Sequence, residues 1–185
     1  MINQNMKHFL IIGGTGMLQK VCLNLNNESS FVSVIGRRQI RLNSLAKKCS
    51  HPENMNTISV DYHNDDQLKK TLKSSFHKYG YPHLIISWIH SSAPYALDIV
   101  IDLMQQSPYT WRLFHVQSSA GVFKKENTSV PATCLYRRVY LGFVIENNRS
   151  RWLTHDEISE GVIDAIITDR LETTVGTLEP WDKRP

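Results

Sequence analysis

Short apolar segments alternate with helix-like segments along the first two thirds of this 185-residue chain. The first segment, residues 8–13, is a continuous apolar run that ends in glycine, as is typical of a strand buried in a parallel sheet. Further strand-like segments follow at 31–36, 57–61, 84–90 and 112–117. Strands separated by helices predict βαβ units, and right-handed crossovers turn these units into a doubly wound parallel sheet between two helical layers.

The segments between the strands have helical patterns, at 16–26, 37–50, from 65 onward and at 94–106. Leu68, Leu72 and Phe76 are spaced four apart and predict one buried helix face. Asp65 is the candidate N-cap of that helix, and Pro94 suits the first turn of the next one.

The last third of the chain has a different pattern. Residues 120–133 are polar and predict a loop, whereas residues 135–145 are rich in Val, Tyr, Leu and Phe and predict a sixth strand. Thr154 and Glu157 form a capping-box pattern that starts another helix, and Trp152 before it is interpreted as a packing anchor. The tail, 173–185, is expected to be irregular.

Composition limits the class of protein. The hydrophobic fraction of 41% and charged fraction of 21% are those of a globular protein, and the length fits one domain over residues 1–185, with a core at about 7–170. No apolar run is long enough for a membrane helix or a signal peptide. The cysteines are three and far apart, which predicts a cytoplasmic protein without a disulfide framework or zinc site.

The net charge of +4 raises nucleic acid as a partner. The basic residues are scattered, however, and no run of five or more occurs. Nucleic-acid binding is therefore kept only as a weak alternative, and a homodimer is the default expectation.

A glycine-rich turn follows the first predicted strand. Its residues are Gly13, Gly14, Thr15 and Gly16, and Met17 and Leu18 lead into the first helix. Glycines at a strand-to-helix turn let the backbone come close to a diphosphate, and the helix start offers unpaired N–H groups. This context predicts a dinucleotide-binding Rossmann domain. The alternative is that the glycines only make a tight turn.

One position departs from the usual fingerprint. A third glycine would be needed at position 19, where this chain has Gln19. That glycine normally permits close packing of helix on strand, so a slightly displaced helix is expected.

The end of the second strand indicates which dinucleotide is bound. NAD-binding proteins usually place an acid there, on the ribose 2′-hydroxyl. This chain has Arg37 and Arg38 instead, and a guanidinium can bind a 2′-phosphate in a bidentate manner. NADP(H) is therefore predicted, unless the arginines merely begin a solvated helix.

Two further strand ends supply candidate cofactor contacts. Asp61 can accept a hydrogen bond from the adenine amino group, with Tyr62 beside the ring, or it can cap the next turn. Ser87 and Trp88 lie in the second half of the fourth strand, where Trp88 packs either in the core or against a cofactor ring.

Together these features resemble the short-chain dehydrogenase/reductase superfamily, in its atypical NAD(P)-binding branch, over roughly residues 7–170. The segment 87–90 stands where that family often has Asn-Asn-Ala-Gly, and Ser118 stands where its fifth strand ends with a catalytic serine. The resemblance implies a Rossmann fold, a nicotinamide cofactor and oxidoreductase chemistry.

The family's Tyr-x-x-x-Lys pair is missing. The residues four positions after the tyrosines are Asp66, His83, Ile85, Ile99, Leu113, Tyr140 and Val144. Tyr136 lies nearest the expected place, although its surroundings predict a strand. A tyrosine with an ordinary pKa of about 10 is a poor base at neutral pH.

Two functions remain open. The chain is an NADPH-dependent reductase of a small carbonyl or enone that works by a non-standard mechanism, or a non-catalytic NADP(H)-binding sensor or regulator. For the reductase, the candidate catalytic residues are Ser118, His90 and Tyr136. Strand-end histidines and serines also occur as plain structural residues.

Overall fold

The computed structural model describes residues 6–124 and 128–185. Seven parallel strands form one sheet in the order β3-β2-β1-β4-β5-β6-β9. Their bounds are Lys7–Ile12 (β1), Ser30–Gly36 (β2), Met55–Ser59 (β3), Leu84–Ser87 (β4), Trp111–Ser118 (β5), Cys134–Leu141 (β6) and Glu172–Val175 (β9). The predicted doubly wound Rossmann sheet is confirmed, with one strand more than the sequence pattern gave.

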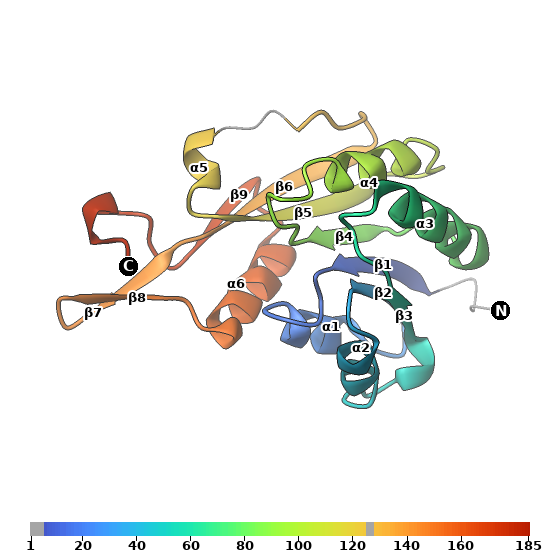
Figure 1. Cartoon of the computed structure of the whole chain (residues 1–185), viewed down its shortest axis with the longest axis horizontal. Helices are drawn as coiled ribbons and strands as arrows, with labels where there is room; N and C mark the ends of the chain where they lie inside the picture. Colours follow the sequence, from blue (N-terminus) through green and yellow to red (C-terminus); the bar gives the residue numbers. More distant parts are fainter. Residues whose placement is uncertain (1–5, 125–127) are drawn as a thin grey trace.

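Helices cover both faces of the sheet (Figure 1). One layer holds α1, α2 and α6, and the opposite layer holds α3 and α4. The helix bounds are Gln19–Leu25 (α1), Gln39–Ala46 (α2), Asp65–Tyr79 (α3), Ala96–Met104 (α4), Gly121–Lys124 (α5) and His155–Thr168 (α6). Among the described residues, no helix has the length and apolar character needed to cross a membrane.

The central strands are buried on both faces because they separate the two layers. In β1, Leu10 and Ile12 pack with the cluster under α3 and α4, whereas Ile11 packs with the cluster under α1, α2 and α6. Each of these side chains is fully buried. This two-sided burial explains the continuous apolar run in the sequence.

The chain reverses its winding at β1, which pairs with β2 on one side and with β4 on the other. The loops after β1 and β4 therefore leave the sheet toward opposite layers. Such a switch point leaves a crevice at the carboxyl ends of the strands, where doubly wound sheets bind ligands.

Helix starts differ from the sequence expectation at two places. The side chain of Asn64, rather than Asp65, caps α3 by accepting a hydrogen bond from the Gln67 N–H at 3.0 Å. Helix α1 begins at Gln19, three residues later than expected, because residues 13–18 form a turn. The capping box of α6 is confirmed, since Thr154 and Glu157 make both of its hydrogen bonds.

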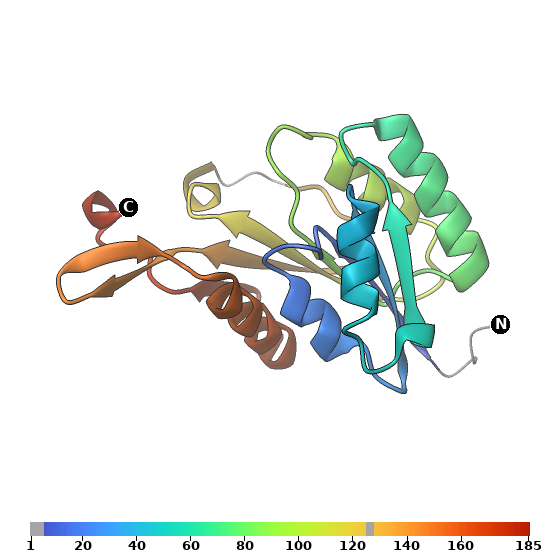
Figure 2. The ribbon, with the colours of Figure 1, turned by 60° about the horizontal axis from the view of Figure 1, so that its bottom comes forward.

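The predicted sixth strand, 135–145, consists of two strands. β6 ends at Leu141, and Gly142 separates it from β7 (Phe143–Glu146), which pairs antiparallel with β8 (Arg149–Trp152). Asn147 and Asn148 connect the hairpin with positive φ angles of 50° and 62°, as a tight two-residue turn requires. Figure 2 shows this hairpin projecting beyond the end of the sheet.

The prediction of an irregular tail was wrong at its start. Residues Glu172–Val175 form β9, which pairs parallel with β6, and Trp181–Lys183 form a short 3-10 helix, η2. As an edge strand β9 is short and mostly polar, so it carries little hydrophobic signal. The loop expected at 120–133 contains α5, and residues 125–127 lie outside the described part of the chain.

Candidate functional site

The glycine turn lies at the switch point, between β1 and α1. Gly13 has a φ of +83°, a conformation that favours glycine. A Cβ atom at Gly13 would lie 2.7 Å from the backbone oxygen of Trp88, which follows β4. The first glycine therefore lets the loops after the two central strands contact each other through their backbones.

Gly14 permits the close packing of α1 on β2. A Cβ atom here would lie 2.6 Å from both Cys22 Sγ and Val34 Cγ1. The sequence pattern assigned this function to a missing glycine at position 19, but Gly14 and the small side chain of Cys22 allow the approach instead. Helix α1 has only seven residues, so the six-residue turn at 13–18 makes up nearly half of this corner.

Gly16 differs from the other two glycines. Apart from its two chain neighbours, no described residue has an atom within 4 Å of the position that its Cβ would occupy, so this side of the turn faces open space. The next residue, Met17, is fixed by α6, because the buried hydroxyl of Ser159 on that helix donates a hydrogen bond to its carbonyl at 2.6 Å. Leu18 is fully buried and anchors the end of the turn.

The end of β2 lies next to the same turn. A Cβ atom at Gly36 would come within 3.0 Å of Thr15 Cγ2, so Thr15 lies directly over this strand end. Arg37 and Arg38 follow and are both exposed. The predicted arginines are thus brought to the edge of the glycine turn.

The end of β3 is tied to the loop after β4 by a chain of side chains. Asp61 Oδ1 accepts from the His63 N–H at 3.1 Å and contacts His63 Nδ1 at 2.7 Å. His63 Nε2 lies 2.7 Å from Ser92 Oγ, which in turn lies 2.8 Å from His90 Nδ1. Asp61 therefore makes the turn contact that was one of its two expected functions.

Charge and hydrogen bonding act together on Asp61. The hydrogen bonds from His63 hold the pKa of the Asp61 carboxyl below its usual value, and the nearby charge of Arg37 contributes in the same direction. Tyr62 is half-buried and its ring stacks on His63, with centroids 4.9 Å apart. A polar edge therefore extends from Arg37 to His90.

The end of β4 presents an unsatisfied hydroxyl. Ser87 is fully buried, and its Oγ has no hydrogen-bond partner among the described residues. It pairs in register with His115 of β5, so both side chains lie on the face that α3 and α4 cover. Buried polar groups without a partner are uncommon in native proteins and suggest a missing water or ligand.

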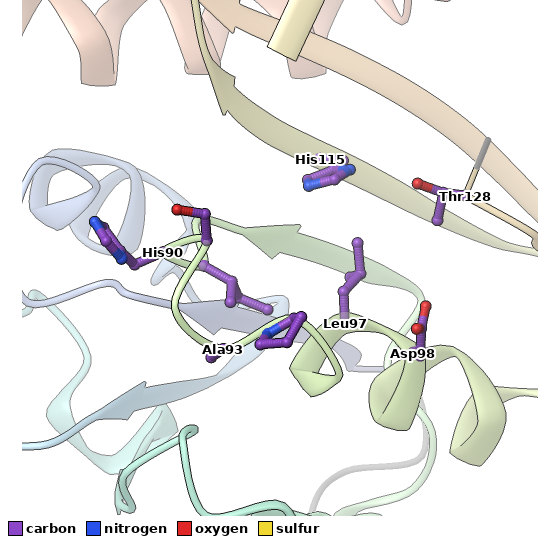
Figure 3. Close-up of a pocket in the computed structure, with 9 residues that line it drawn as sticks. His90, Ala93, Leu97, Asp98, His115 and Thr128 are labelled. Carbon is purple, nitrogen blue, oxygen red and sulfur yellow. The ribbon is translucent and has the colours of Figure 1, made fainter. Parts of the chain in front are cut away.

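A cavity of about 250 Å³ lies between the start of α4 and β5 (Figure 3). Leu97 and Asp98 of α4 line one side, and His115 of β5 and Thr128 line the other. His90, the last residue of the polar edge, lies at the opposite end of the cavity from Asp98.

A neighbouring cavity of about 380 Å³ brings Ser118 and His90 to the same space. Trp88 and His115 also line it. The structure thus brings together two of the three predicted catalytic residues.

Tyr136 lies elsewhere on the sheet. Its Cα pairs with that of Leu113, five residues before Ser118 along β5. At the usual rise per residue of a strand, the Cα atoms of Tyr136 and Ser118 are therefore about 16 Å apart along the strand direction. Its hydroxyl lies 2.8 Å from His115 Nδ1 and donates to Thr128 Oγ1 at 3.2 Å. Tyr136 is therefore joined to the cavities through His115.

Burial keeps both members of this pair neutral. Desolvation lowers the pKa of His115 to about 4, and the Arg138 charge adds to this effect. Desolvation also raises the pKa of Tyr136 above its usual value. A neutral imidazole facing a neutral phenol holds geometry, but neither group is poised to exchange a proton at pH 7.

Sequence reasoning missed several residues of this site. Ser159, His63 and Ser92 act through contacts between segments distant in the chain, and no local pattern marks them. Among the described residues, no group of three or more His, Cys, Asp or Glu side chains could hold a metal ion.

Comparison with known proteins rests on structure, because no protein-family model and no curated protein sequence matches this chain. A variant of actinorhodin polyketide ketoreductase with NADPH superposes with a TM-score of 0.71 at 12% identity, covering 96% of this chain and 98% of that one. A short-chain glucose/ribitol dehydrogenase from Brucella melitensis gives 0.69 at 11% identity, with 92% and 94% covered. A citronellol catabolism dehydrogenase from Pseudomonas aeruginosa gives 0.67 at 12% identity, with 92% and 93% covered.

The chain has the fold of these dehydrogenases and reductases. At such low identity the likeness concerns the fold alone. The chemistry of the site has to be argued from its own residues.

Proposed function

We propose that residues 1–185 form one NADP(H)-binding domain, and that the cofactor's diphosphate lies on the glycine turn. The observation that carries this proposal is that the three glycines differ in whether a side chain would fit at their positions. Gly13 and Gly14 are required by packing, whereas Gly16 faces open space at the switch point. A turn built only for packing would have no need of glycine at position 16.

The proposed 2′-phosphate site is formed by Arg37 and Arg38. Both side chains are exposed at the end of β2, beside Thr15 of the turn. No carboxylate follows β2 directly, and the nearby Asp61 carboxylate is engaged by His63. Guanidinium groups bind phosphate through paired charge-assisted hydrogen bonds.

The other residues of the crevice fit the rest of such a cofactor. Asp61 and Tyr62 lie at the polar edge where the adenine would be placed, and Asp61 keeps its second oxygen for the amino group. Ser87 offers a buried hydroxyl without a described partner. Trp88 lines the cavity that also contains Ser118, and provides a flat apolar surface.

We further propose an atypical reductase of a small carbonyl or enone. When bound, NADPH supplies a hydride for the substrate carbon. The Ser118 hydroxyl donates a hydrogen bond to the substrate oxygen and polarises it. His90, which lines the same cavity, passes a proton from solvent to that oxygen. Tyr136 acts as a positioning residue that orients His115.

The second candidate is a non-catalytic NADP(H)-binding sensor or regulatory protein. The raised pKa of Tyr136, its distance from Ser118 and the absence of a Tyr-x-x-x-Lys pair favour this alternative. NADPH binding without turnover on any carbonyl would support it.

A titration with NADPH and with NADH tests the proposal. We expect the native chain to bind NADPH more tightly, and the double variant Arg37→Ala with Arg38→Ala to lose about 2 kcal/mol of NADPH binding, roughly 30-fold, with little change for NADH. Arg170→Ala is the matched control, since it removes an exposed arginine elsewhere. Equal affinities for both cofactors in all three proteins would contradict the phosphate site.

The same samples decide between the two functions. Oxidation of NADPH in the presence of a panel of small aldehydes, ketones and enones supports the reductase. Loss of that oxidation in Ser118→Ala, with NADPH binding retained, is expected if Ser118 polarises the substrate.

A further inference from the structure

A third cavity, of about 290 Å³, lies between the glycine turn and the carboxyl-terminal segment. Met17, Trp88 and Ser118 line its inner side, and Trp152 of the hairpin and Arg184 line its outer side. These residues come from five segments far apart in the chain. Trp88 and Ser118 also line the 380 Å³ cavity described above, so the two spaces adjoin at the proposed reaction centre.

Arg184 is held in a defined position by two indole rings. Its guanidinium carbon lies 5.0 Å from the centroid of Trp152 and 4.9 Å from that of Trp181. The backbone N–H of Arg184 also donates to the Trp181 carbonyl at 3.1 Å. Stacking occupies the faces of a guanidinium and leaves its in-plane N–H groups for an anion.

The cavity has no negative charge to balance Arg184, because none of its described lining residues is acidic. The acids in and just after the hairpin are already paired, since Glu146 lies 2.8 Å from Arg151 and the acids Asp156 and Glu157 at the start of α6 also have basic partners. Lys20 lies 3.1 Å from Asp156, and Arg151 lies 2.9 Å from Glu157. Among the described carboxylates, none lies within ion-pair distance of Arg184.

The remaining walls are mainly apolar. Besides the two tryptophans and Met17, they are formed by Leu141, Leu153 and Ile158. The cavity therefore combines a mainly apolar body with one fixed cation, Arg184, and a polar end at Ser118 and Ser119; His155 also belongs to its lining. Such a combination selects a small apolar molecule with an anion at one end and an acceptor at the other.

We infer that this cavity is the substrate site, and that the substrate is a small apolar oxo acid whose carboxylate pairs with Arg184 while its carbonyl oxygen accepts from Ser118. The inference rests on the proposed reductase function. The reaction balances as a two-electron reduction, in which oxo acid, NADPH and one proton give hydroxy acid and NADP⁺. The hydride adds to the carbonyl carbon, and the C=O bond pair moves to the oxygen, which takes the proton from solvent through His90.

Calorimetric titration with 6-oxoheptanoate, whose carboxylate and carbonyl lie toward opposite ends of an apolar chain, and with its methyl ester tests the inference. The two probes share the apolar body and the carbonyl, and differ only in the negative charge. We expect the acid to bind the native chain at least about tenfold more tightly than the ester. In Arg184→Gln the preference should disappear, in Arg184→Lys it should be only partly retained, and in the control Arg170→Gln it should be unchanged.

Titrations are run with and without NADPH, so that the two proposals fail separately. Acid binding that depends on Arg184, in a chain that binds no NADPH, would leave this inference standing and overturn the proposed function. Equal binding of acid and ester, no binding of either under both conditions, or a preference that survives in Arg184→Gln would overturn the inference. Thermal melting of each variant verifies that the fold is intact.

Discussion

The two halves of the sheet differ in how closely residues pack around the loops that follow their strands. In the half formed by β1, β2 and β3, glycines and arginines meet at a corner where Gly13 and Gly14 are required by packing and Gly16 faces open space. In the half formed by β5 and β6, the described residues between the strands include only the four-residue helix α5. His115 faces a cavity beside α4, and Tyr136 contacts His115. The proposed cofactor-binding corner is thus closely packed, whereas the region of the proposed catalytic residues has only a short helix between its strands.

This difference shows how binding and chemistry can separate within one fold. The glycine turn depends mainly on packing between β1, α1 and β2, and the loop after β4 and Ser159 of α6 also contact it. Proton transfer depends on groups whose pKa values are adjusted by charged neighbours, and here burial adjusts them toward neutrality. The experiments that follow break or sharpen this contrast.

The largest effect is expected at Gly14. Gly14→Val would place side-chain atoms within the space of Cys22 Sγ and Val34 Cγ1, which lie 2.6 Å from an added Cβ. We expect a loss of about 3 kcal/mol or more in the free energy of unfolding, because overpacked cores relax poorly. Urea denaturation measures this loss. Gly16→Ala serves as the control, since its Cβ would enter open space; a similar loss there would contradict the division among the glycines.

The next effect is a pH dependence of the free energy of unfolding, which one histidine in each half of the sheet contributes. Burial lowers the pKa of His8 in β1 and of His115 in β5, each from 6.5 to about 4. Because the folded state holds these imidazoles neutral while the unfolded state protonates them, their contribution is fully present above pH 6.5. It is lost as the pH falls from 6.5 toward 4, by about 3 kcal/mol for each histidine.

Urea denaturation at pH 7 and pH 4.5 of the native chain, His8→Gln and His115→Gln measures these contributions separately. We expect each variant to lose less stability on acidification than the native chain. If His115→Gln followed the native pH dependence, the β5 imidazole would not be desolvated as described.

A smaller effect is expected at Ser159, which supports the glycine turn from α6. Ser159→Ala removes the hydrogen bond to the Met17 carbonyl and leaves a buried acceptor without its donor. We expect a loss of about 1 to 2 kcal/mol in stability together with weaker NADPH binding. Thr168→Ala, which removes an exposed hydroxyl from the same helix, is the control. Unchanged cofactor affinity in Ser159→Ala would separate α6 from the binding site.

The sequence pattern predicted the first half of this molecule better than the second, for physical reasons. Strands buried on both faces, such as β1 and β2, must be continuously apolar, so their composition reveals them. The edge strand β9 buries little more than Val175, and therefore has no such signature. The hairpin turn at Asn147 and Asn148 did carry a local signal, which the apolar run around it obscured.

The residues of the candidate site also divide into those that the sequence pattern could predict and those that it could not. Gly13, Gly16 and Arg37 follow strands directly, so their meeting at one edge could be expected from the order of the elements. Arg184 and Ser159 reach the site from the last quarter of the chain through tertiary packing. Trp152, expected to be a packing anchor, is 47% exposed and lines the third cavity. No spacing rule relates such residues to the glycine turn.

The central claim is that a dinucleotide's diphosphate lies against the open side of the turn at Gly16. Calorimetric titration of NADPH into the native chain and into Gly16→Val tests it most directly. We predict that Gly16→Val keeps the native unfolding midpoint, because its side chain enters open space, but binds NADPH at least about tenfold more weakly. Equal NADPH affinity in the two proteins, or no NADPH binding to the native chain at millimolar concentration, would contradict the account.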